Sequence, residues 1–129
     1  MTVPPTRPLA GQHVLLVEDE FLIAMTIEAA LREAGADVLG PAKSVAAARA
    51  LLPQKPTLAV LDYRLVGGET SLPVAHDLLA RDVPFLFHTG NATPTTLRAE
   101  FPGVTVLTKP CADRMVAEAC AALLGPTPR

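Results

Sequence analysis

The sequence lacks the features that mark several large classes of protein. It has no tryptophan, only two cysteines, and no apolar run long enough to cross a membrane or to act as a secretory signal after Met1. Eleven Lys and Arg residues oppose thirteen Asp and Glu residues, without a basic cluster of the kind that binds nucleic acid. These absences predict a soluble, cytoplasmic protein that binds neither membrane nor nucleic acid.

The two cysteines, Cys111 and Cys120, are expected to be unpaired. They fall within one expected helix, at a spacing that turns them to opposite faces. Two free thiols fit a reducing compartment. No His or Cys partners stand at the spacing of a zinc site, so we expect no metal or redox role for the thiols.

What remains is the composition of one globular domain. The chain has 129 residues, of which 50% are hydrophobic and 19% charged. A chain of this length buries about two-thirds of its unfolded surface and needs no metal or disulfide to fold. Prolines gather at both ends. We therefore expect a disordered tail over residues 1–10, one domain over residues 11–125 and a short tail over residues 126–129.

Short apolar strands alternate with helical segments along this domain. The expected strands cover residues 13–17, 37–39, 58–61, 85–87 and 104–107. The expected helices cover residues 20–34, 44–52, 73–81, 93–101 and 113–124. Five such alternations predict an α/β fold with a parallel sheet that helices cover on both faces.

Polar side chains follow four of the five strands. They supply three carboxylates, a hydroxyl and an ammonium: Glu18, Asp19, Asp62, Thr89 and Lys109. Because ligands bind beyond the carboxyl ends of parallel strands, we expect these side chains to meet in one crevice. A cluster of acids favours a cation, and hard oxygen ligands with room for water suit Mg²⁺. A carboxylate beside Mg²⁺, a hydroxyl and a lysine can attack a phosphoryl group.

Taken together, these motifs resemble the receiver domain of bacterial two-component response regulators. Val-Glu-Asp-Glu, Leu-Asp, Thr-Gly and Lys-Pro occur in the family's order, and the likeness covers residues 12–124. The resemblance implies a flavodoxin-like (βα)5 fold with strand order 2-1-3-4-5. The segments 65–69 and 84–90 are similar to an alphaproteobacterial subgroup with a Phe-Ala-Thr-Gly motif, which implies a kinase of the HWE type as partner.

The resemblance also implies a phosphoacceptor and a metal site. Asp62 would accept a phosphoryl group from a sensor histidine kinase and become an aspartyl phosphate. Asp19, Asp62 and the backbone carbonyl of Arg64 would bind Mg²⁺ directly, and Glu18 would act through water. The protein would catalyse only its own phosphorylation and dephosphorylation, so it is not an enzyme toward other substrates.

The residues after the last two strands would hold the phosphoryl group and transmit its presence. Thr89 would bond a phosphoryl oxygen, Lys109 would pair with the phosphate, and the peptide between Lys109 and Pro110 is expected to be cis. Val106 stands where the family has a switch aromatic. The resemblance therefore points to another switch, and we expect the helix over residues 93–101 to become ordered on phosphorylation.

The function implied is that of a stand-alone phosphoprotein in a phosphorelay. It would signal by binding an unknown downstream protein, or drain phosphate from its kinase, as a monomer or a phosphorylation-dependent dimer. One alternative is a pseudo-receiver that binds partners without being phosphorylated. Another is a small phosphotransfer enzyme of the haloacid-dehalogenase type. The nucleophile of that family follows the first strand, and a second Asp lies two residues after it. In this chain the candidate nucleophile, Asp62, follows the third strand, and the residue two positions on is Arg64.

Overall fold

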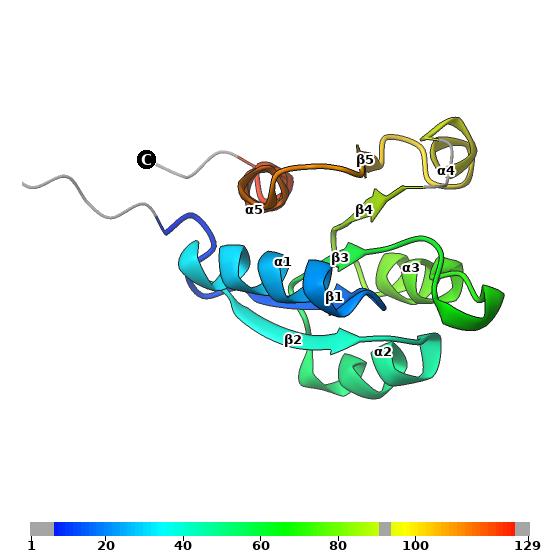
Figure 1. The fold of residues 1–129 in the computed structure, drawn as a ribbon, viewed down its shortest axis with the longest axis horizontal. Helices are drawn as coiled ribbons and strands as arrows, with labels where there is room; N and C mark the ends of the chain where they lie inside the picture. The colour runs from blue at the N-terminus through cyan, green and yellow to red at the C-terminus, as the bar shows by residue number, and fades with distance from the viewer. Residues whose placement is uncertain (1–6, 91–93, 126–129) are drawn as a thin grey trace, which may run out of the picture.

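A five-stranded parallel sheet forms the centre of the protein, which a computed structural model describes over residues 7–90 and 94–125. The strand order is β2-β1-β3-β4-β5, which confirms the flavodoxin-like topology expected from the sequence (Figure 1). In chain order the strands are β1 His13–Val17, β2 Asp37–Ala42, β3 Leu58–Leu61, β4 Phe85–Thr89 and β5 Thr105–Thr108.

Helices cover both faces of the sheet. They are α1 Phe21–Glu33, α2 Val45–Leu51, α3 Leu72–Ala80, α4 Pro94–Glu100 and α5 Asp113–Leu123, with short 3-10 turns η1 Leu52–Gln54 and η2 Val66–Gly68. In Figure 1, α1 and α5 lie on one side of the sheet, and α2, α3 and α4 lie on the other. None of these described helices is long and apolar enough to cross a membrane.

The core has two layers because successive strand residues point to opposite faces. Val14, Leu16 and Leu86 pack under α1 and α5, whereas Leu15 and Phe87 pack under the other three helices. All four residues of β3, the central strand, are buried. Strands covered on both faces read as continuous apolar runs, which is why the sequence pattern could locate them.

Two strands extend beyond the ends expected from the sequence. β2 continues to Ala42 through a cis Gly40–Pro41 bond, and β4 continues to Thr89. Gly40 has a φ of +104°, and a Cβ there would lie 2.8 Å from the carbonyl oxygen of Leu16, so glycine is required. A proline is tolerated in β2 because this strand is at the edge of the sheet.

The packed domain also begins earlier than residue 11. Leu9 is fully buried, and its backbone N–H donates to the carbonyl of Ala34 at 2.9 Å. Of the two expected tails, residues 1–6 and 126–129 lie outside the described residues, as does Thr93 of the expected switch helix. Cys111 precedes α5 instead of belonging to it, and both cysteines are free.

Candidate functional site

The carboxyl ends of β1, β3, β4 and β5 meet at one edge of the sheet and bring the predicted site together. Backbone hydrogen bonds fix this edge: Asp62 N donates to Val17 O, and Lys109 N donates to Thr89 O, both at 2.9 Å. Lys109 and Asp62 are 47 positions apart in the chain, yet their side chains are in contact. The convergence is a direct consequence of parallel topology.

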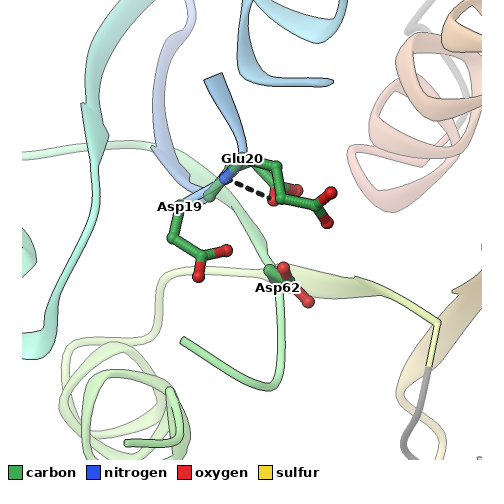
Figure 2. Close-up of side chains that lie close together, drawn as sticks. Asp19, Glu20 and Asp62 are labelled. Carbon is green, nitrogen blue, oxygen red and sulfur yellow. Dashed lines mark hydrogen bonds between the residues drawn. The ribbon is translucent and has the colours of Figure 1, made fainter. Parts of the chain in front are cut away.

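Four carboxylates gather at this edge, one more than the sequence analysis assigned. Glu18, Asp19, Glu20 and Asp62 each offer an oxygen that lies within 4.8 Å of the others. Figure 2 shows Asp19 and Glu20 approaching Asp62 from two sides. Sequence reasoning gave Glu20 no role although it belongs to the Val-Glu-Asp-Glu motif. Its position directly after the strand-end pair was the available signal.

Lys109 is the ammonium of the site and contacts three of these carboxylates. Its Nζ lies 3.2 Å from Asp62 Oδ2, 3.2 Å from Glu18 Oε1 and 3.4 Å from Glu20 Oε1. Burial acts to lower the pKa of Lys109, but the charges of Asp62 and Glu18 and their hydrogen bonds outweigh it and raise the pKa overall. The lysine is therefore held in its charged form. The bond before Pro110 is cis, as the resemblance implied.

The pKa values of the two buried acids, Glu18 and Asp62, are raised, whereas an ion pair with a lysine ordinarily lowers the pKa of a carboxyl group. Burial, followed by the charge of Asp62, raises the pKa of Glu18 to about 7, although Lys109 acts against the shift. Burial also raises the pKa of Asp62, although Lys109 again acts against it. The charge of one ammonium thus does not outweigh burial and the repulsion between the acids, and Glu18 is partly protonated near neutral pH.

The donor set fits Mg²⁺. All ligand atoms are hard carboxylate oxygens, which this ion prefers, and their excess negative charge would be offset by a divalent cation. The cavity has a volume of about 280 Å³, which leaves space for coordinated water. Its lining consists of Asp19, Glu20, Asp62, Arg64, Leu65, Gly90 and Lys109.

The backbone of Arg64 is fixed by a short hairpin that follows β3. Arg64 forms a bridge with Thr70, Leu65 N donates to Glu69 O at 2.8 Å, and Ser71 N donates to Tyr63 O at 2.9 Å. Arg64 lines the cavity, which is where the predicted carbonyl ligand has to lie. A defined loop conformation holds such a carbonyl in place better than a flexible loop.

Thr89 and His88 end β4 and face opposite sides of the sheet, as strand alternation predicts. Thr89 is buried, and its Oγ1 has no hydrogen-bond partner among the described residues. It does not line the cavity itself, but the adjacent Gly90 does. His88 is buried as well, and burial, followed by the charge of Lys109, lowers its pKa to about 4.

The fold and this arrangement of acids, threonine and lysine are those of a response regulator receiver domain. No protein-family model matches the chain. The solution structure of SdrG from Sphingomonas melonis Fr1 has a TM-score of 0.75 and 42% identity, covering 91% of this chain and 98% of SdrG. The receiver domain of the PhyR response regulator from Erythrobacter litoralis has a TM-score of 0.78 and 28% identity, covering 93% of this chain and 98% of that domain.

A curated relative extends the likeness to a longer protein. The phyllosphere-induced regulator PhyR of Methylorubrum extorquens is 35% identical over 80 residues, which are 60% of this chain and 30% of that protein. This chain therefore matches only a part of PhyR. It belongs to the response regulator receiver domains, and within them to the alphaproteobacterial group of PhyR and SdrG.

Proposed function

We propose that this response regulator accepts a phosphoryl group on Asp62 from a sensor histidine kinase, in a reaction that depends on Mg²⁺. The observation that carries the proposal is the contact of Lys109 Nζ with Asp62 Oδ2 at 3.2 Å, within a cluster that includes three further carboxylates. A carboxylate with an ammonium and a divalent-cation site beside it is equipped for phosphoryl transfer.

The transfer would take place at a carboxylate oxygen of Asp62. This oxygen forms a bond to phosphorus while the bond from phosphorus to the kinase's histidine nitrogen breaks. The electron pair of that bond returns to the imidazole, which then takes a proton. Lys109 offsets negative charge on the transferred group. The hydroxyl of Thr89, which accepts and donates no hydrogen bond within the described part of the chain, can donate one to that group.

Mg²⁺ would be held by the residues that the resemblance to receiver domains implies. Asp19, Asp62 and the carbonyl of Arg64 are its proposed direct ligands, and Glu18 its ligand through water. When bound, the ion supplies positive charge to the transferring oxygens. The excess of acids over lysine supports this assignment, and the pKa values of Glu18 and Asp62 are raised, mainly by burial, even with Lys109 in contact with both.

Exposed apolar side chains beside the site support a protein as phosphodonor. Phe21, Leu22 and Met25 are exposed on α1, and Met115 is exposed on α5. Both helices begin at the edge of the sheet that carries the site. Exposed apolar patches of this kind mark surfaces that bind proteins. We propose that the kinase binds this patch, and the resemblance to the subgroup implies a kinase of the HWE type. After phosphorylation the protein would either bind an unknown downstream protein or drain phosphate from the kinase.

The decisive experiment is phosphorylation of the intact chain with a phosphorylated kinase or a small phosphodonor in the presence of Mg²⁺. We expect a label that is stable to acid and labile to hydroxylamine. Asp62→Asn should abolish it, because an amide is not a nucleophile. Asp82→Asn is the matched control, since Asp82 is exposed, lies at the far end of α3 and has a φ of 57° that Asn also tolerates. Equal labelling of wild type and Asp62→Asn would show that Asp62 is not the acceptor and overturn the proposal. No label on either protein would leave the pseudo-receiver alternative.

A further inference from the structure

Glu20 is the exposed member of the carboxylate cluster, and the proposed chemistry does not use it. Its side chain is 62% exposed, whereas that of Lys109 is 15% exposed. The Oε1 atom lies 3.4 Å from Lys109 Nζ, and the backbone N–H of Glu20 donates to Glu18 Oε2 at 3.2 Å. Figure 2 shows its carboxylate beside Asp62. The backbone is thus tied to the site while the carboxylate stays at its entrance.

The carboxylate of Glu20 has no evident structural task. Glu20 occupies the position before α1 where a side chain often caps the helix, but its side chain forms no cap hydrogen bond. Its backbone carbonyl accepts from Ala24 N, and this bond does not depend on the side chain. The contact that the described structure gives to the carboxylate is the one with Lys109.

A phosphoryl group on Asp62 would change what Lys109 has to pair with. In the resting site the ammonium is shared between Asp62, Glu18 and Glu20. Phosphorylation replaces one negative charge at Asp62 by nearly two, and Lys109 would then be drawn to the phosphoryl oxygens. Glu20 opposes this in two ways, since it attracts the same ammonium and repels the new negative charge.

We propose that Glu20 is a positioning residue that competes with the phosphoryl group for Lys109 and thereby limits how tightly the site holds that group. This inference rests on the proposed function, because it requires a phosphoryl group or its mimic at Asp62. An exposed ion pair such as Glu20–Lys109 shifts an equilibrium by up to about fivefold, and the shift weakens in salt.

The test measures the binding of beryllofluoride, a phosphoryl mimic, at saturating Mg²⁺. Binding is monitored by amide NMR shifts or by the fluorescence of Tyr63, the single tyrosine, which adjoins Asp62. Glu20→Gln should bind the mimic up to about fivefold tighter than wild type, and the gain should shrink in high salt. Glu28→Gln is the control. Like Glu20→Gln it removes one negative charge and one ion pair, but its ion pair, with Arg32 at 3.0 Å, lies on α1 away from the site. This control should bind like wild type, and Glu20→Asp should lie between.

Binding of Mg²⁺ alone separates the proposal from its alternatives. Glu20→Gln should leave the affinity for Mg²⁺ unchanged or lower it slightly, since removing a carboxylate cannot attract a cation. Parallel weakening of Mg²⁺ and of the mimic would make Glu20 a metal ligand and overturn the proposal. Equal affinities for the mimic in wild type, Glu20→Gln and Glu28→Gln would overturn it as well. If wild type binds Mg²⁺ but no mimic, the proposed function itself fails, and this inference fails with it.

Discussion

Replacing His88 with alanine removes a buried imidazole whose protonation is strongly disfavoured in the folded protein. The residue is 3% exposed, and neither ring nitrogen has a hydrogen-bond partner among the described residues. Burial, and then the positive charge of Lys109, lower the pKa from 6.5 to about 4, while Asp113 acts against the shift. In the unfolded chain the ring regains its ordinary pKa, so the unfolded state binds the proton first.

This difference in pKa makes the stability of the protein depend on pH. Above about pH 7 the ring is neutral in both states and contributes no pH dependence. As the pH falls from 6.5 toward 4, the unfolded chain gains a proton that the folded protein does not, and the free energy of unfolding decreases. The full loss is about 3 kcal/mol, and about 2 kcal/mol of it is present at pH 5.

Urea denaturation of wild type, His88→Ala and His88→Gln at pH 7.5 and pH 5 tests this reasoning. Between the two pH values wild type should lose about 2 kcal/mol more than either variant. The cavity left in His88→Ala lowers its stability at both pH values and cancels in this comparison, and His88→Gln limits that cavity. Glu18 and Asp62 act in the opposite direction, because their raised pKa values add stability as the pH falls, but they are common to all three proteins. Parallel pH dependences in wild type and both variants would refute the argument.

Three further results are expected. Asp19→Asn should lower the affinity for Mg²⁺ and, without Mg²⁺, leave the free energy of unfolding unchanged or higher, because it relieves repulsion between like charges; an unchanged Mg²⁺ titration would place the metal elsewhere. Because burial raises the pKa of Glu18 to about 7, protons should compete with Mg²⁺ below pH 7, and the affinity for Mg²⁺ should fall by up to about tenfold per pH unit. A similar fall in Glu18→Gln would show that protonation of Glu18 is not the cause. Beryllofluoride should raise the protection of residues 94–101 from amide hydrogen exchange in wild type but not in Thr89→Ala. The reason is that the short helix α4 buries one of its residues, Leu97, so the order of this helix depends on packing. Full protection before activation would exclude this switch.

The sequence was informative where topology decides the outcome. The apolar runs located the strands, and parallel pairing then required Asp62 and Lys109 to meet although they are far apart in the chain. Resemblance to a known family added the strand order and the cis bond before Pro110. The strand order and the meeting of Asp62 with Lys109 depend on the general arrangement of the fold and tolerate an error of one or two residues in any boundary. The cis bond follows instead from the match of a single Lys-Pro motif.

Local patterns failed where a tertiary contact overrides them. The prolines near the N-terminus are typical of a tail, yet Leu9 packs against the end of α1 and is tied to Ala34. His76 Nε2 on α3 lies 2.9 Å from Glu100 Oε2 on α4, and the centroid of its ring lies 4.8 Å from that of Phe101. Such pairings join helices that sequence spacing does not relate, so no local pattern could reveal them.

The negative charge of the site affects both its proposed binding of a metal ion and its proposed contact with a phosphoryl group. Glu18 and Asp62 have raised pKa values although Lys109 touches both, so burial and mutual repulsion of the acids exceed what one ammonium offsets. A divalent cation would restore the balance, which is why we expect cation binding to release a proton. A phosphoryl group on Asp62 would disturb the balance again. The cation and Lys109 would offset the added negative charge, and Glu20, which competes for Lys109, should weaken the contact between Lys109 and the phosphoryl group.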